Sequence, residues 1–448
     1  MTTYQDIELE HLIKEEEQRQ DNTLTMIASE NYVFPYVYAC SGSMLTNKYS
    51  EGRVGARYYG GTAYIDLIED LCQKRALKLF NLDPEVWGAS VQPYSGSVAN
   101  FAAYSAMTVP GGKIMGMDLP SGGHLTHGFQ TKAKKISGTS LYFSSHPYTV
   151  TDKGVIDYDA LEEQFNQVLP DILICGYSAH SQDLQYERLR SIAGNRAFLF
   201  ADISHISALI SAGLMNSPFE HCDVVMTTTH KGLRGPRGAI IFFKKSVTVS
   251  GTTHNLDQKV NSAVFPLLQG GPHNHTIAGI AHALEMASRP EFKASLQQVV
   301  KNSQVLVRVL KNKGYNIVTE STVNHIALVD LRNKNIKGQD VETVCDFLGL
   351  TINKNAVPND QSFFKPSGIR LGTYAITTRG LKEEETERLA LIIDFAACMA
   401  LAHQESGSSL ALSEWLCEKS PERQKMLLDV QNQIAALARQ FPVPKLHN

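Results

Sequence analysis

The chain has 448 residues, of which 43% are hydrophobic and 19% are charged, and its formal net charge is -3. This composition is typical of a soluble globular protein with two or three structural units. The near-neutral charge, without a basic run, argues against dedicated nucleic-acid binding, and no run approaches the roughly 18 apolar residues of a membrane span. The seven cysteines are scattered without a CxxC pair, which indicates reduced thiols rather than a disulfide framework.

The N-terminal segment is acidic and amphipathic, with Leu9, Leu12 and Ile13 on one helical face. It lacks the apolar core of a secretory signal and the Arg/Ser-rich, acid-poor composition of a transit peptide. We therefore expect a cytoplasmic protein in which residues 1–45 form a helical arm. Apolar residues at helical spacing predict a further helix over residues 64–80.

The middle of the chain carries short apolar runs that begin at Ile172, Phe198 and Val224, two successive steps of 26 residues. A predicted helix over residues 184–193 separates the first two runs. Repeated strand–helix–strand units of this length predict an α/β fold with buried parallel strands. A further apolar strand starts at Ala239.

Polar side chains follow three of these predicted strands. They come from residues 177–180, 202–205 and 227–231. Because ligands of open α/β sheets bind outside the carboxyl ends of the strands, these side chains are expected to share one crevice. Loops after strands are commonly polar in any case, so this pattern alone names no reaction.

The pattern changes after residues 269–272. Long helical patterns alternate there with short strand-like runs, namely helices over 276–288, 291–313 and 381–403, strands over 316–318, 325–328 and 369–371, and a helical tail over 413–439. This predicts a smaller α+β domain over residues 276–448, after a large cofactor-binding domain over residues 46–275.

Small residues at Ser95, Gly96 and Ser97 open a predicted helix. Free backbone N–H groups and the positive end of the helix dipole suit a phosphate there, although a plain serine N-cap is the alternative. The chain has no Walker lysine and no GxGxxG, so neither a nucleoside triphosphate nor a dinucleotide is indicated.

Lys231 ends a predicted strand before the glycine-rich segment GLRGPRG, where a flat aldehyde can approach its amine. Asp202 offers a carboxylate that would keep a pyridine nitrogen protonated, so that the ring acts as an electron sink. Lysine, carboxylate and phosphate cradle together favour pyridoxal phosphate. The pairs His124/His127 and His273/His275 lack an HExxH glutamate or a Cys/His quartet, so no metal site is predicted.

Several long motifs resemble serine hydroxymethyltransferases, in the same order and over roughly residues 20–400, and they look closer to eukaryotic than to bacterial members. The motifs are IASEN (27–31), LTNKYSEG (45–52), RYYGG (57–61), VQPYSGSVAN (91–100), GGHLTHG (122–128), ADISH (201–205), TTTHKGLRGPRG (227–238), NSAVFP (261–266), QGGPHNH (269–275), INKNAVPND (352–360) and PSGIRLGT (366–373).

The resemblance implies a pyridoxal-phosphate transferase of fold type I, with a large domain built on a mostly parallel sheet and a smaller C-terminal α+β domain. It implies reversible interconversion of serine and glycine through an external aldimine and a quinonoid. The one-carbon unit passes to tetrahydrofolate, giving 5,10-methylenetetrahydrofolate.

The resemblance also carries roles onto matching positions. Catalytic roles fall on Lys231 as the Schiff-base lysine, Asp202 as the partner of the ring nitrogen, His124 as the ring-stacking residue, Glu51 and His205. Cofactor contacts fall on Ser95, Gly96, Ser97, Ser178, His230, Tyr49 and Gly271, in addition to His124, Asp202, His205 and Lys231. Substrate contacts fall on Ser29, Glu51, Tyr58, Tyr59 and Arg370, and folate contacts on Leu119, Gly123, Leu125, Asn355, Ser362, Phe363 and Phe364.

The family shares its active site between subunits, so the resemblance implies a homodimer, or a homotetramer built from such dimers. Five residues would then arrive from the partner chain, namely Tyr49, Glu51, Tyr58, Tyr59 and Gly271. Glu51 is the candidate acid/base for the serine hydroxyl and the folate amine, so partial burial of its carboxyl group is expected to matter. Without the motif it reads as a solvated loop carboxylate.

Two departures from the family pattern leave every catalytic group in place: Arg53-Val54 replaces a usual Tyr-Pro, and Tyr374 replaces a usual proline. One alternative function is a threonine-type aldolase or an aminotransferase of the same fold type, working without folate. GGHLTHG and NKNAVPND argue against it. The other is an idle scaffold or RNA-binding relative, which would have lost Lys231 or Arg370.

Overall fold

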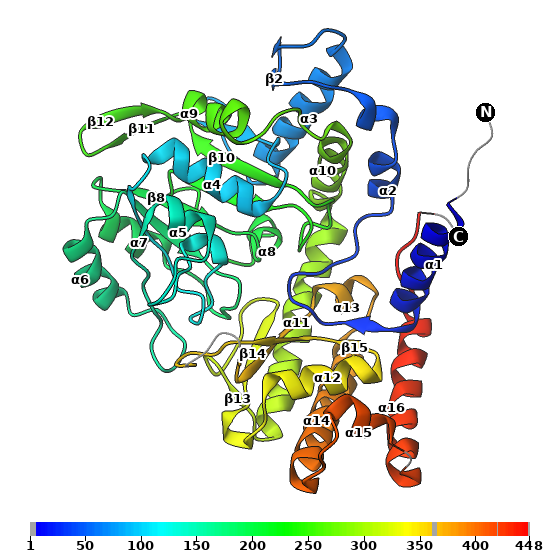
Figure 1. Cartoon of the computed structure of the whole chain (residues 1–448). Coiled ribbons are helices and arrows are strands. Elements are labelled where there is room, and N and C mark those ends of the chain that lie inside the picture. Colours follow the sequence, from blue (N-terminus) through cyan, green and yellow to red (C-terminus); the bar gives the residue numbers. More distant parts are fainter. Residues whose placement is uncertain (1–5, 361–364, 419, 447–448) are drawn as a thin grey trace.

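A seven-stranded sheet with the order β4-β10-β9-β8-β7-β5-β6 forms the centre of the larger part of the molecule (Figure 1). The structure is a computed structural model that describes residues 6–360, 365–418 and 420–446. The strands are β4 Trp87–Ser90, β5 Lys113–Met115, β6 Ser144–Ser145, β7 Ile172–Gly176, β8 Phe198–Asp202, β9 Val224–Thr228 and β10 Ala239–Lys244. Strands β5 to β9 pair in parallel, whereas β10 runs antiparallel to both of its neighbours. The mostly parallel sheet is confirmed.

Both faces of this sheet are covered, which explains why its strands are apolar throughout. Along β7, Ile172 and Ile174 belong to one hydrophobic core, while Leu173 and Cys175 belong to the core on the opposite face. The helices and short elements of this part are α3 Ala63–Leu79, α4 Gly96–Met107, η2 Leu125–His127, α5 Gly138–Tyr142, α6 Tyr158–Val168, α7 Tyr186–Ala193, α8 Ser207–Ser211, β11 Ser246–Val249, β12 Thr252–Asn255, α9 Leu256–Ser262, η3 Ala263–Leu268 and α10 Asn274–Ala287.

A second, smaller sheet lies in the C-terminal half, with the order β13-β14-β17-β16 and antiparallel pairing throughout. Its strands are β13 Asn316–Ile317, β14 Ile326–Asp330, β16 Asn353–Asn355 and β17 Gly368–Gly372. The other elements of this half are α11 Pro290–Asn312, η4 Arg332–Lys334, α12 Gly338–Leu348, β15 Leu350–Thr351, α13 Tyr374–Thr378, α14 Glu383–Ser406, α15 Leu412–Cys417 and α16 Pro421–Gln440. The tail expected to be helical over 413–439 forms two helices, α15 and α16, and the second starts at Pro421, a first position that suits a proline.

The N-terminal segment lies against this smaller half (Figure 1). Helix α1 (Ile7–Asn22) contacts α16, and β1 (Leu24–Thr25) pairs in parallel with β15. The chain then passes through α2 (Tyr36–Ser41) and η1 (Met44–Asn47) to a short hairpin of β2 (Gly52–Arg53) and β3 (Ala56–Arg57). Helix α11 joins the halves, because Leu296 belongs to the first core and Leu310 to the second. The domain boundaries stay a prediction.

Within the described ranges, α14 is the one helix long and apolar enough to cross a membrane by length and composition. Its apolar side chains, including Leu389, Ile393 and Ala397, belong to the second core, and it packs against α11 and α12. Packing in that core accounts for its apolar composition.

Candidate active site

A cavity of about 460 Å³ lies at the carboxyl ends of β7, β8 and β9, where the smaller sheet meets the larger one. It collects residues that are far apart in the sequence. Its lining includes ten of the residues expected at the site, namely Ser29, Leu119, Gly123, His124, Leu125, Ser178, His205, Lys231, Asn355 and Arg370. The expectation that several strand ends share one crevice is confirmed.

Lys231 follows β9 and is buried, with its amine in the cavity lining. The amine donates a hydrogen bond to Thr228 Oγ1 at 3.1 Å. Burial lowers the pKa of this amine to about 8, although the nearby Asp202 carboxylate opposes the shift. A larger share of the amine is therefore the neutral nucleophile at physiological pH than in a solvated lysine.

Asp202 ends β8 and is buried next to a set of hydrogen-bond donors. Asn100 Nδ2 donates to its Oδ2 at 2.9 Å, His127 Nε2 lies 3.2 Å from the same oxygen, and the Ser204 N–H donates to Oδ1 at 3.0 Å. Burial alone would raise the pKa of this carboxyl group, but the hydrogen bond and charge of His127 hold it well below the ordinary value. Asp202 is thus a buried carboxylate that stays ionised.

Helix α4 begins beside these residues and offers an anion cradle. The side chain of its N-cap residue, Ser95, makes no capping hydrogen bond, so the N–H groups of the first turn are available for an anion. A Cβ atom at Gly96 would lie 2.7 Å from Thr228 Cγ2, so this close approach of helix and strand needs glycine. His230 Nδ1 is buried without a hydrogen-bond partner in the described part of the chain. Ser95, Gly96, Ser97 and His230 lie outside the cavity lining proper.

Three aromatic side chains pack together at the cavity, and one of them, His205, lines it. His205 Nδ1 lies 3.3 Å from His325 Nε2, and burial holds the pKa of both imidazoles well below the ordinary value. Both rings are therefore neutral. One of the two facing nitrogens carries a proton and donates it in a hydrogen bond to the other. Tyr374 stacks on His325 at 4.0 Å between ring centroids and donates to the His205 carbonyl at 2.9 Å. The tyrosine at this departure from the family pattern thus holds the backbone of His205. On the cavity wall, burial lowers the pKa of His124 to about 4.

Arg370 on β17 reaches from the smaller sheet into the cavity. Its Nη1 donates to the Ser178 carbonyl at 2.8 Å, and Asn353 Oδ1 accepts from Nε at 3.4 Å and from Nη2 at 3.3 Å. Burial lowers the pKa of the guanidinium to about 10, which still leaves it fully charged at neutral pH. Arg370 is a fixed cation within the cavity lining.

The residues expected from a partner chain lie together elsewhere, outside this cavity lining. Tyr49 and Tyr58 are exposed, and each makes a ring contact with Tyr59. Tyr49 also packs on Gly271, and the Glu51 carboxylate lies close to Gly270. Of the folate-contact residues expected from the sequence, Ser362, Phe363 and Phe364 lie outside the described residues.

Sequence reasoning missed Asn100, His127 and His325 as site residues. Asn100 and His127 lie 102 and 75 residues from Asp202, and the available signal was their place in the motifs VQPYSGSVAN and GGHLTHG. Over the same described residues, no three His, Cys, Asp or Glu side chains converge on a possible metal position.

The residues present fit pyridoxal phosphate by their chemistry. A buried amine with a lowered pKa suits an aldehyde, a buried ionised carboxylate suits a protonated ring nitrogen, and an uncapped helix start beside an unpartnered imidazole suits a phosphate. Together with the mostly parallel sheet, these features define the class of pyridoxal-phosphate-dependent enzymes of fold type I.

Comparison with known proteins narrows this class. The sequence profile of the family "Serine hydroxymethyltransferase" matches residues 2–393. A cytosolic serine hydroxymethyltransferase of Encephalitozoon cuniculi is 55% identical, with 98% of this chain and 96% of that protein covered. The cytosolic enzyme of Oryctolagus cuniculus is 48% identical (98% and 93% covered), and serine hydroxymethyltransferase 4 of Arabidopsis thaliana is 49% identical (90% and 88% covered).

The chain belongs to the serine hydroxymethyltransferase family. It interconverts serine and glycine with tetrahydrofolate as the one-carbon carrier, and its relatedness to eukaryotic members is confirmed.

Proposed function

We propose that pyridoxal 5'-phosphate is the coenzyme of this chain and that Lys231 holds it covalently. Asp202 would hold a proton at the ring nitrogen, His124 would stack on the ring, and Ser178 and His205 would border it. Ser95, Gly96, Ser97 and His230 would bind the phosphate, together with Tyr49 and Gly271 of a partner chain. The observation that carries this proposal is the buried, pKa-lowered amine in one cavity beside a buried ionised carboxylate. When bound, the coenzyme supplies the electron sink for cleavage of the Cα–Cβ bond of serine.

The remaining residues would bind substrate and transfer protons. Arg370 provides a bidentate fork for the amino-acid carboxylate, and Ser29 lines the same cavity. Glu51 would exchange protons with the serine hydroxyl and the folate amine, with Tyr58 and Tyr59 beside the substrate. Leu119, Gly123, Leu125 and Asn355 would contact folate, together with the segment 362–364.

We also propose a homodimer with shared active sites, which could assemble further into a tetramer. Large side chains are exposed on η1, just after the hairpin and on α3, including Met44, Tyr58, Tyr64 and Leu67, and such side chains favour a protein interface. The exposed tyrosines near Glu51 are the residues that a partner's cavity would receive. Sedimentation velocity checks this assembly, and a monomeric active enzyme would contradict it.

A cytosolic location is proposed as well, because the related enzymes of Encephalitozoon cuniculi and Oryctolagus cuniculus are named cytosolic. Cell fractionation tests this location, and recovery in an organelle would contradict it.

The activity is tested with the purified protein as isolated. We expect serine and tetrahydrofolate to give glycine and a folate-bound one-carbon unit, and glycine plus tetrahydrofolate to build a new visible absorbance band. Cleavage of β-hydroxy amino acids with no dependence on folate would instead support the aldolase alternative.

Replacing Arg370 with alanine is expected to raise the KM for serine by at least roughly 10- to 150-fold, because even one hydrogen bond to a charged group contributes about 1.5–3 kcal/mol. Arg370→Lys should recover only part of this loss, because the ammonium keeps the positive charge but cannot form two parallel hydrogen bonds to the carboxylate. Steady-state kinetics with serine varied at saturating tetrahydrofolate measures the effect. An unchanged KM for serine in Arg370→Ala would count against this role.

A further inference from the structure

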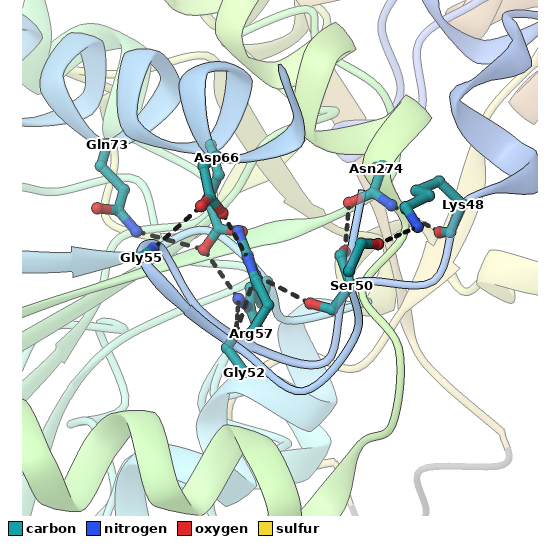
Figure 2. Close-up of polar contacts among 11 residues, drawn as sticks. Lys48, Ser50, Gly52, Gly55, Arg57, Asp66, Gln73 and Asn274 are labelled. Carbon is teal, nitrogen blue, oxygen red and sulfur yellow. Dashed lines mark hydrogen bonds and ion pairs between the residues drawn. The ribbon is translucent and has the colours of Figure 1, made fainter. Parts of the chain in front are cut away.

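One buried guanidinium holds the backbone on both sides of Glu51 (Figure 2). Arg57 Nη1 donates to the carbonyl oxygens of Ser50 and Gly52, at 3.0 Å each. These two residues flank Glu51 in the chain, and the carbonyl of Glu51 itself accepts from the Tyr58 N–H at 2.9 Å. Three successive carbonyl groups are therefore fixed, and the backbone at Glu51 has little freedom.

The same guanidinium is anchored on helix α3 by two ion pairs. Arg57 Nε donates to Asp66 Oδ1 at 2.7 Å, and Nη2 donates to Glu69 Oε2 at 2.6 Å. The side chains of Arg57 and Glu69 are 2% and 3% exposed, so solvent and salt screen this contact little. Gln92 Nε2 completes the anchor, because it donates both to Glu69 Oε1 at 2.8 Å and to the Gly52 carbonyl at 3.0 Å.

A second anchor ties the start of this segment to helix α10, as Figure 2 also shows. Ser50 Oγ donates to Asn274 Oδ1 at 2.9 Å, and Asn274 Nδ2 donates to the Lys48 carbonyl at 2.8 Å. Lys48 Nζ closes the segment by donating to the Gly60 carbonyl at 2.6 Å. The loop over residues 48–60 is thus held by polar contacts within one chain, of which the Ser50–Asn274 contact is buried and the Lys48–Gly60 contact is exposed.

The carboxylate of Glu51 is held differently from its backbone. It forms no hydrogen bond or ion pair with another described residue. Its Oε1 lies 3.1 Å from the place that a Cβ atom of Gly270 would occupy, so it faces a glycine without a side chain. The backbone sets the point from which this side chain reaches, and Arg57 fixes that backbone.

We propose that Arg57 is a positioning residue for the reaction, which acts by fixing the backbone that carries Glu51. This inference rests on the acid/base role proposed for Glu51. An arginine suits the task because its planar fork serves two carbonyl groups and two carboxylates at once, whereas the single ammonium of lysine cannot. The loop over residues 48–60, which carries Glu51, is then preformed for proton transfer before serine binds.

The test uses Arg57→Lys in the holoenzyme, because this change keeps a positive charge between the two carboxylates. Arg57→Ala would leave both carboxylates buried and unpaired, which threatens folding. We expect kcat to fall roughly 10- to 100-fold, the cost of a misplacement of about 1 Å, while the KM for serine changes less than about threefold. The matched control is Arg75→Lys on α3, the helix that anchors Arg57: Arg75 binds the Ala281 carbonyl and Glu285 but not the hairpin, so kcat should not change.

A double-mutant cycle with Glu51→Gln separates positioning from a general structural effect. If Arg57 acts through Glu51, Arg57→Lys costs no further activity in the Glu51→Gln background, because that carboxylate is already absent. Losses that multiply, or a wild-type kcat in Arg57→Lys, would overturn the proposal. A second variant, Gln92→Met, keeps the test available if Arg57→Lys fails to fold. It removes the second donor to the Gly52 carbonyl, so we expect a smaller loss of kcat that is again absent in the Glu51→Gln background.

Hydrogen exchange gives a readout that does not depend on turnover. The amide of Tyr58 should exchange faster in Arg57→Lys than in Arg75→Lys. The comparison is made on variants that have the same oligomeric state as the wild type. Equal exchange in the two variants would contradict the clamp. A different result would contradict the acid/base role of Glu51 itself. In that case Glu51→Gln would retain folate-dependent turnover, or the wild type would have no such turnover.

Discussion

Replacing Lys231 with alanine is expected to abolish multiple turnover while the chain still folds. The amine is a buried cation that costs desolvation energy, and among the described residues it donates a hydrogen bond only to a neutral hydroxyl group, Thr228 Oγ1. Its removal leaves no orphaned carboxylate, since Asp202 keeps its bonds from Asn100, His127 and the Ser204 N–H. What is lost is the nucleophile that holds the coenzyme.

Borohydride reduction followed by peptide mapping measures the covalent link directly. The wild type should carry a borohydride-stable pyridoxyl group on Lys231, and Lys231→Ala should carry none at any position. Circular dichroism checks the fold. Lys244→Ala, a change at the far end of the antiparallel strand β10, serves as the control and should keep full activity. Multiple turnover by Lys231→Ala at the wild-type rate would refute the role.

The lowered pKa of this amine gives a pH dependence whose sign follows from its protonation. Only the neutral amine attacks an aldehyde, and the folded coenzyme-free protein has half of Lys231 neutral near pH 8, against about 10.5 for a solvated lysine. The rate of pyridoxal-phosphate capture should therefore rise with pH up to about 8 and level off above it. Stopped-flow absorbance measures this rate, and a continued rise toward pH 10 would show that the amine is solvated.

The sequence predicted best those features that depend on local patterns. The strands that begin at Ile172, Phe198, Val224 and Ala239 were found at the expected residues, because runs buried on both faces are apolar throughout. Their polar ends predicted the cavity, because parallel strands place their carboxyl ends at one edge. The break in the C-terminal tail was missed, although Pro421 was visible as a helix-starting residue.

Features built from distant partners could not be predicted in this way. Nothing in the local pattern links Asn100 to Asp202, or Arg57 to the carbonyl groups around Glu51, since hydrogen bonds between distant segments leave no periodicity. Without the family motifs, Arg370 reads as a member of a surface salt bridge and Glu51 as a solvated loop carboxylate. The family resemblance therefore supplied the candidate roles, and the structure supplies the contacts through which each role can be tested.

The second large effect is expected for Asp202→Asn, which keeps the size of the side chain but removes its charge. Two donors, Asn100 Nδ2 and His127 Nε2, address one carboxylate oxygen, while the Ser204 N–H addresses the other. An amide offers a single oxygen, so its NH2 group must face a donor on one side. We expect the free energy of unfolding to fall by about 3–5 kcal/mol, the typical cost of removing one partner of a buried charged pair. We expect kcat to fall as well, because a neutral amide cannot hold a proton at the ring nitrogen.

The control for this prediction is Asp223→Asn, which also removes a buried carboxylate from the same sheet. Asp223 precedes β9, at the edge opposite the cavity, where it accepts hydrogen bonds from Arg190 at 2.6 Å and from the Leu199 N–H at 2.8 Å. Both changes should lower thermal stability, because each disturbs a buried hydrogen-bonded charge. Only Asp202→Asn should also lower kcat and coenzyme affinity, since a carboxylate can hold a proton at the ring nitrogen only from the cavity end of the sheet. Equal kcat values in the two variants would mean that Asp202 stabilises the fold without serving the coenzyme.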